Sequence, residues 1–189
     1  MRTGTAVPTY DDYARLEPSA LLARLDRTPA ELDAAVRTRA DEALRRRPAP
    51  ASWSPLEIGC HLRDVEDLFQ TRYHTILGAS EPAIFVLGAS AEQLAPWGVR
   101  VGIGHPLDPD RWAEDRQYAR QDPTAALAAF RRRRGDVLAL LRALDPAQWE
   151  RGGVHPGRGR MALRQWVASH AAHDDNHLDQ LRRALGERP

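Results

Sequence analysis

Three histidines have the residue type and the spacing to hold a metal ion. His173 and His177 are four residues apart in a segment with helical periodicity, so their side chains would lie on one helix face. His61 lies on the apolar face of an earlier helical segment. A buried imidazole needs a partner for each ring nitrogen, and charged imidazoles repel one another. A divalent ion resolves this conflict because it takes one nitrogen from each ring.

Three histidine ligands would also make such a site reactive. A tetrahedral ion with three protein ligands keeps one position open for water or substrate, as catalytic sites do. The ion could lower the pKa of a bound water or thiol and make a nucleophile near neutral pH. Nitrogen ligands suit zinc, nickel, iron and copper. From the spacing alone, a core role for the histidines is an equal alternative.

Three other polar residues on or near these helix faces are candidates for the wall of a pocket. His170 lies about one turn before His173 on the same helix and could line the pocket or belong to the core. Asp174 follows His173 directly, about 100° around the helix, and could orient a ligand. Arg134 could bind a substrate carboxylate, but we favour a stem packed on the core with its head in water.

Three further residues near the histidines have simpler interpretations. Glu57 lies one turn before His61 and fits a helix cap better than a catalytic base. Gln180 could face the pocket or the solvent, and Cys60 fits a small buried residue. The group that would perform the chemistry is therefore the bound water or thiol rather than a named side chain.

Helix-start signals indicate the elements that must position these residues. Ser54-Pro55-Leu56-Glu57 and Thr28-Pro29-Ala30-Glu31 each combine a capping hydroxyl, a proline at the first helical position and a glutamate three residues after the cap. Asp122-Pro123 and Asp145-Pro146 carry the same type of signal. Each signal predicts that a helix begins at its proline.

Apolar residues at steps of three and four predict four long helices packed as an antiparallel bundle. The expected ranges are 29–46, 55–77, 123–144 and 162–185, with a short helix at 19–26. Residues 78–121 form a long connection, in which 83–87 and 99–103 could pair as a small hairpin. We interpret residues 151–160 as a helix-to-helix turn.

Composition bounds the class of protein. The 189 residues suit one domain, 1–189 with its core at about 19–185, and the fold class is all-α. The net charge of +1 argues against nucleic-acid binding, and no apolar run could span a membrane. The single cysteine excludes an internal disulfide, and all 27 basic residues are arginine, which excludes lysine chemistry. We expect a cytoplasmic protein.

Two segments resemble motifs of the DinB/YfiT-like superfamily. Residues 53–62, WSPLEIGCHL, followed by Asp64 and Glu66, are similar to its first motif, and residues 173–181, HDDNHLDQL, are similar to its closing motif. Residues 110–113 and 149–159 are similar to its linking elements, so the resemblance covers about 21–185. It implies an up-down-down-up four-helix bundle whose metal ligands are His61, His173 and His177.

The resemblance also implies a range of functions. The family includes thiol-dependent S-transferases that use bacillithiol or mycothiol, and its members commonly form dimers. We therefore expect a zinc or nickel enzyme, a homodimer, that activates a thiol or water for S-transfer or hydrolysis on a small molecule. The alternatives are a non-catalytic, stress-related metal-binding dimer and a helical interaction module with core histidines. The connection at 78–121 departs from the family and is expected to reshape the pocket mouth.

Overall fold

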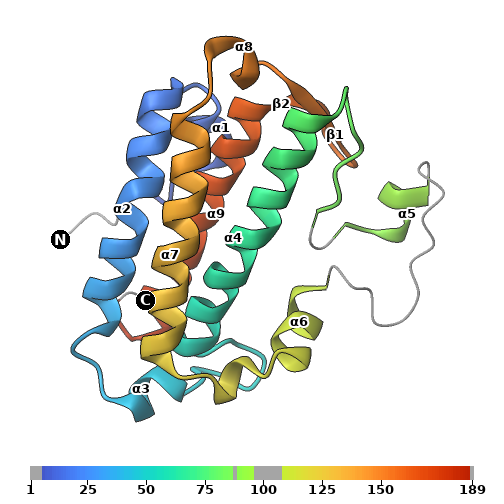
Figure 1. The fold of residues 1–189 in the computed structure, drawn as a ribbon. Coiled ribbons are helices and arrows are strands. Elements are labelled where there is room, and N and C mark those ends of the chain that lie inside the picture. Colours follow the sequence, from blue (N-terminus) through green and yellow to red (C-terminus); the bar gives the residue numbers. More distant parts are fainter. Residues whose placement is uncertain (1–5, 87–88, 96–107, 188–189) are drawn as a thin grey trace.

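The computed structural model describes residues 6–86, 89–95 and 108–187. Its elements, shown in Figure 1, follow one another in a simple order. They are α1 (Tyr10–Tyr13), α2 (Pro18–Val36), α3 (Asp41–Arg45), α4 (Pro55–Gly78), α5 (Ala91–Leu94), α6 (Pro109–Asp115), the 3₁₀ helix η2 (Tyr118–Arg120), α7 (Pro123–Arg142), α8 (Pro146–Trp149), β1 (Gly152–His155), β2 (Gly159–Ala162) and α9 (Leu163–Ala184).

The four long helices α2, α4, α7 and α9 form a four-helix bundle. Helices α4 and α2 each pack against both α7 and α9. In Figure 1, α2 and α9 run in one direction and α4 and α7 in the other, which is the up-down-down-up order. This order confirms the up-down-down-up bundle that the resemblance implied, whereas the antiparallel packing expected from periodicity does not hold between the neighbours α4 and α7. These neighbours run parallel because the long connection returns the chain to the end at which α4 begins.

The capping signals at the starts of α4, α7 and α8 are confirmed. The Ser54 backbone N–H donates to Glu57 Oε2 at 2.8 Å, and the Glu57 N–H donates to Ser54 Oγ at 3.3 Å. Asp122 accepts from the N–H of Ala125 at 2.7 Å, and Asp145 forms the same type of cap on α8. Each cap satisfies backbone donors that the first helical turn leaves free.

The predicted helix start at Thr28 is wrong, because α2 continues through Pro29 to Val36. Pro29 has no N–H, so it cannot donate to the carbonyl of Leu25 four residues earlier. Arg134 on α7 supplies the missing donor, with Nη1 2.8 Å from the Leu25 oxygen. The Thr28 hydroxyl instead donates to Asp174 Oδ2 at 2.7 Å. The two expected helices at 19–26 and 29–46 are therefore one helix, followed by the separate α3.

The segment that we interpreted as a helix-to-helix turn is a β-hairpin. β1 and β2 pair antiparallel, with Gly152 opposite Ala162 and His155 opposite Gly159. A Cβ on Gly153 would lie 2.7 Å from the Cγ1 atom of Ile84, so only glycine allows this close approach.

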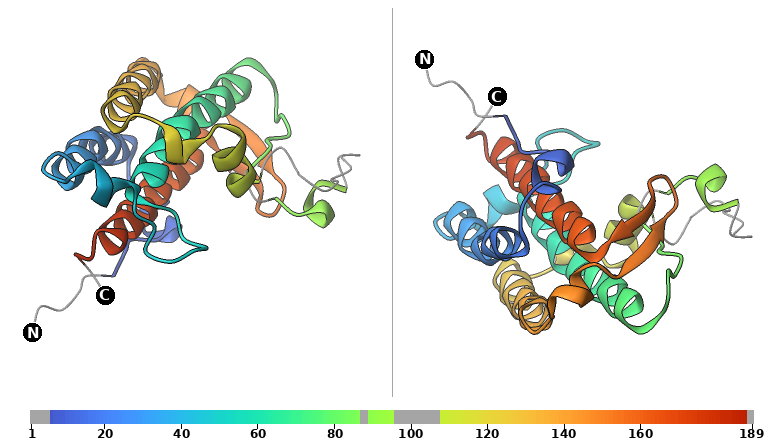
Figure 2. Two further views of the ribbon diagram at one scale, coloured as in Figure 1. Left: turned by 90° about the horizontal axis from the view of Figure 1, so that it is seen from below. Right: turned by 90° about the horizontal axis from the view of Figure 1, so that it is seen from above.

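The first of the two apolar runs in the connection pairs with β1 instead of forming a hairpin of its own within the described residues. Ala83 forms a single bridge with Val154 of β1, and the Ile84 N–H donates to the Val154 oxygen at 2.9 Å. The other run, 99–103, lies outside the described residues. Both views in Figure 2 place the hairpin on the side of the bundle formed by α4 and α9.

The core lies between the four helices, and its largest cluster includes Leu25, Phe69, Leu141 and Trp166. A second cluster around Ile58 and Phe130 fills the end nearer α3. Within the described ranges, no helix is both long and apolar enough to cross a bilayer. The bundle thus provides a rigid frame for side chains on the facing sides of α4 and α9.

Candidate metal centre

The structure brings the three candidate ligands together. His61 comes from α4, and His173 and His177 come from successive turns of α9. One ring nitrogen from each of them lies within 4.8 Å of the other two. The Nε2 atoms of His61 and His173 are 3.2 Å apart. The four-residue spacing places His173 and His177 on one face of α9, and the packing of α4 on α9 adds His61 as the third ligand.

The environment of these rings suits a shared cation. The buried rings of His61 and His173 have no hydrogen-bond partner among the described residues except each other, because their Nδ1 atoms are unpaired. Their two Nε2 atoms face each other, so without an ion one ring would have to donate to the other. A tetrahedral ion with bonds of 2.0–2.1 Å holds its ligand nitrogens about 3.3 Å apart. The observed separation of 3.2 Å matches that spacing.

A hydrogen bond fixes the third ring. His177 Nδ1 lies 2.8 Å from Gln180 Oε1, so this nitrogen carries the proton and donates it to the amide oxygen. The Nε2 atom then keeps its lone pair, which a metal ligand needs. Trp53 packs beside the same group, with its ring centroid 4.8 Å from that of His61. Of the two interpretations of Gln180, the structure supports the one in which it faces the site.

Electrostatics keep all three imidazoles neutral near pH 7. Burial, followed by the charge of His177, lowers the pKa of His61 from 6.5 to about 3. Burial also lowers the pKa of His173 well below its usual value, and that of His177 to a smaller extent. Neutral imidazole is the form that coordinates metals, so no ring would first have to lose a positive charge.

A cavity of about 890 Å³ opens beside the three histidines. This size is within the usual range of small-molecule sites. Its wall comes from α4, α9, the hairpin, the loop before α4 and the connection between α4 and α7. The lining residues are Ala51, Ser52, Trp53, His61, Val65, Phe69, Arg72, Val86, Ala89, Gln93, Pro109, Asp110, His155, Arg158, Trp166, Ser169, His173, Asn176, His177, Gln180 and Arg183.

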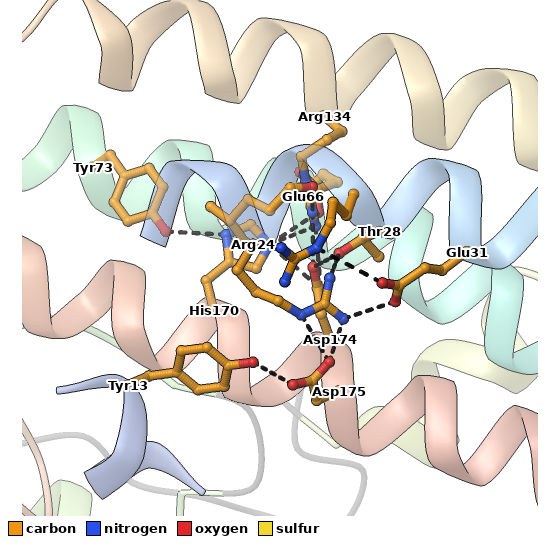
Figure 3. A network of polar contacts seen from close by, with 12 residues as sticks. Tyr13, Arg24, Thr28, Glu31, Glu66, Tyr73, Arg134, His170, Asp174 and Asp175 are labelled. Atoms are coloured by element: carbon orange, nitrogen blue, oxygen red, sulfur yellow. Dashed lines mark hydrogen bonds and ion pairs between the residues drawn. The ribbon is translucent and has the colours of Figure 1, made fainter. Parts of the chain in front are cut away.

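The three other pocket candidates lie behind this wall, in a buried polar network (Figure 3). Arg134 is 1% exposed, so our expectation of a solvated head is wrong. Its Nε donates to Glu66 Oε2 at 2.9 Å and its Nη1 to Asp174 Oδ2 at 2.7 Å. His170 Nε2 lies 2.9 Å from Glu66 Oε1, and its Nδ1 lies 3.0 Å from the Tyr73 hydroxyl. None of His170, Arg134 and Asp174 lines the cavity.

This network ties three helices to the turn of α9 that carries His173. Glu66, His170 and Asp174 also offer atoms close enough for an ion, but the Arg134 guanidinium already supplies their positive charge. The same network extends to Arg24 of α2, which pairs with Asp175, and Asp175 also accepts a hydrogen bond from Tyr13. We therefore assign the network a positioning role.

Two residues near the site have the structural roles that the sequence indicated. Glu57 caps α4 and pairs with Arg47, and it does not line the cavity. Cys60 is fully buried, and burial raises the pKa of its thiol to about 12. Arg72 and His155 are among the residues of the cavity wall that sequence reasoning missed. The only signal for Arg72 was its place three helical turns beyond His61.

Comparison with known proteins places the chain in a family. Residues 24–181 match the DinB superfamily. The chain is 26% identical over 169 residues to a Bacillus subtilis (strain 168) protein named "Putative metal-dependent hydrolase YfiT", covering 86% of this chain and 82% of that protein. The solved structure of YfiT from Bacillus subtilis is described as a probable metal-dependent hydrolase with an unusual four-helix bundle topology. It matches with a TM-score of 0.70 and 22% identity, over 98% of this chain and 94% of that one. A family match over most of the chain and a shared fold together show that this protein is a member of the DinB superfamily.

Proposed function

We propose that this protein is a metal-dependent hydrolase that acts on a small molecule. His61, His173 and His177 would hold the ion, and the adjoining cavity would hold the substrate. The observation that carries the proposal is the convergence of three neutral imidazoles at the wall of a cavity of ligand size. The name of the relative YfiT points to the same chemistry.

Each group of residues at the site would have a separate role. A divalent ion held there would supply Lewis acidity, which polarises a carbonyl and makes a water molecule more acidic. The three ligands are uncharged, so they leave the full positive charge of the ion for this purpose. Gln180 holds the His177 ring in the required tautomer, and the ring of Trp53 covers one side of His61. The network around Arg134 keeps the helix that carries two ligands in place.

Zinc and nickel are the ions that we propose for three nitrogen ligands. All three ligands come from one chain, so the homodimer that we expect would not be needed to complete the site. S-transfer from a low-molecular-weight thiol is the second candidate function. A cavity of about 890 Å³ has room for two reactants, which supports S-transfer as a candidate.

Metal content tests the ligand set directly. Untagged protein is stripped with a chelator, reloaded with zinc or nickel, and measured by elemental analysis. We expect one ion per chain in the wild type and none in His173→Ala. His74→Ala is the matched control, because His74 is an exposed histidine on α4. Unchanged metal content in His173→Ala would refute the assignment.

Turnover then distinguishes the functions. The loaded protein is tested with ester and amide panels, and with pairs of thiols and electrophiles. Chelator-sensitive hydrolysis supports the proposal, and chelator-sensitive turnover that needs a thiol supports S-transfer. A protein that binds metal and turns over neither panel would instead be the non-catalytic bundle.

A further inference from the structure

Arg72 on α4 is a buried arginine of the cavity wall without a carboxylate partner. Its side chain is 7% exposed. Its Nε donates to the carbonyl oxygen of Phe85 at 3.0 Å. The guanidinium carbon lies 5.0 Å from the ring centroid of Phe69 and 5.8 Å from that of Trp166. No described residue accepts a hydrogen bond from its Nη1 or Nη2.

The other buried arginines of the described chain are neutralised. Arg24 pairs with Asp175, and Arg134 pairs with Glu66 and Asp174. Burying a charge is costly unless it is paired, so such pairing is the rule. All aspartates and glutamates of the sequence lie within the described residues, so no carboxylate side chain from elsewhere in the chain can pair with Arg72.

Arg72 nevertheless stays charged. Burial lowers its pKa to about 10, so the guanidinium is still protonated at neutral pH. The aromatic rings of Phe69 and Trp166 offset part of the desolvation through their negative faces. They provide no hydrogen-bond acceptor for the two Nη groups. The cavity wall thus contains a charged group of which only the Nε–H has an acceptor among the described residues.

The hairpin adds a second donor to the same cavity. His155 Nδ1 accepts from the N–H groups of Gly157 and Arg158 at 3.0 and 3.2 Å. The proton therefore sits on Nε2, which is a donor. Burial, followed by the charges of Arg158 and Arg72, lowers the pKa of His155 to about 4. His155 is thus a neutral N–H donor close to two arginines.

Arginines outnumber carboxylates in the described lining of the cavity, although Arg183 is paired with Asp179. This lining contains three arginines, Arg72, Arg158 and Arg183, and one carboxylate, Asp110. Phe69 connects Arg72 to the candidate metal centre, because its ring centroid is also 5.9 Å from that of His173. A small molecule could therefore reach Arg72 and the three-histidine centre at the same time.

We propose that Arg72 and His155 form a subsite that binds the carboxylate group of the substrate. The free Nη edge of a guanidinium offers parallel N–H groups that match the two oxygens of a carboxylate. That the bound carboxylate belongs to a substrate rests on the proposed hydrolase function. Carboxylate binding at the subsite does not rest on that function, because the residues of the subsite are separate from the metal ligands. The substrate class is a small carboxylic acid with its reacting group placed toward the three histidines.

Calorimetric titration of chelator-treated protein tests the subsite without the metal. The probes are acetate and benzoate, their neutral analogues acetamide and benzamide, and inorganic phosphate. We expect saturable binding of at least one carboxylate and no binding of the amides. Arg72→Met should weaken carboxylate binding roughly tenfold or more, because charge-assisted hydrogen bonds are lost. Arg132→Met, which removes an exposed arginine of α7, should leave it unchanged.

Two more measurements distinguish a carboxylate subsite from a purely structural arginine and from a phosphate site. Arg72→Met should bind zinc as the wild type does and melt at the same or a higher temperature, because it removes an unpaired buried charge. A marked fall in its Tm, or carboxylate binding equal to wild type, would overturn the subsite. Tighter binding of phosphate than of the carboxylates would overturn its assignment to a carboxylic acid. If the wild type binds benzoate through Arg72 but retains no metal, the hydrolase proposal fails and the subsite stands.

Discussion

Replacing Arg134 by methionine should destabilise the fold strongly. Arg134, Glu66 and Asp174 are each 0–1% exposed, and the arginine is the common partner of both carboxylates. Removing it leaves two buried negative charges facing each other, and it also leaves the Leu25 carbonyl opposite Pro29 without a donor. Methionine fills much of the same volume, so the lost charge, rather than a large cavity, dominates the effect.

The expected magnitude follows from these contacts. Breaking a buried ion pair by removing one partner typically costs about 3–5 kcal/mol. For a chain of this length, each kcal/mol lowers Tm by about 2–4 °C. We therefore expect Arg134→Met to melt about 6–20 °C below the wild type. Thermal unfolding followed by far-UV circular dichroism at pH 7 measures the shift.

Two further variants separate the effect of the lost charge from the effect of losing an arginine side chain. Arg132→Met removes an exposed arginine of the same helix and should change stability by no more than about 0.5 kcal/mol. The triple variant Glu66→Gln, Arg134→Met, Asp174→Asn removes all three charges and should be more stable than Arg134→Met alone. A Tm of Arg134→Met within about 2 °C of that of Arg132→Met, which corresponds to no more than about 1 kcal/mol, would refute the reasoning. A triple variant no more stable than the single one would assign the loss to packing.

Two other outcomes test the site and the network. Gln180→Leu should weaken zinc binding about 10–100-fold in a competition titration, because the Nδ1–H of His177 loses its acceptor. A zinc affinity equal to that of the wild type would show that Gln180 does not support the ligand His177. Burial alone would raise the pKa of Glu66, but Arg134 and His170 outweigh it and hold that pKa below the usual 4.5. This carboxylate therefore contributes stability that is present above about pH 4.5 and is lost as pH falls through the lower pKa of the folded state. Denaturant unfolding from pH 6 to 3 should show a smaller loss of stability in Glu66→Gln than in the wild type; equal slopes would contradict this assignment.

Local sequence signals were sufficient wherever neighbouring residues decide the structure. The caps at Ser54 and Asp122 involve atoms only three residues away, so the sequence predicts the starts of α4 and α7 correctly. The pair His173 and His177 shares a helix face because of the helical period alone. The inward face of His61 follows from the apolar stripe around it, so the sequence is sufficient to name the three candidate ligands.

Contacts between distant segments override such signals elsewhere. Thr28-Pro29 carries a good helix start, yet α2 runs through it because Arg134, more than a hundred residues away, bonds the carbonyl that Pro29 leaves free. The buried charge of Arg134 could not be predicted, since its burial depends on carboxylates from α4 and α9 meeting it.

The cavity wall depends on the same kind of long-range contact. Arg72 and His155 are 83 positions apart in the chain, and they line one cavity only because the hairpin packs beside α4. Periodicity reports which face of a helix is apolar, but it does not report which charges the neighbouring helices bring to that face. Whether an arginine is solvated, paired or left facing a cavity is an energetic property of the packed molecule, because desolvation and pairing involve all of the surrounding elements at once.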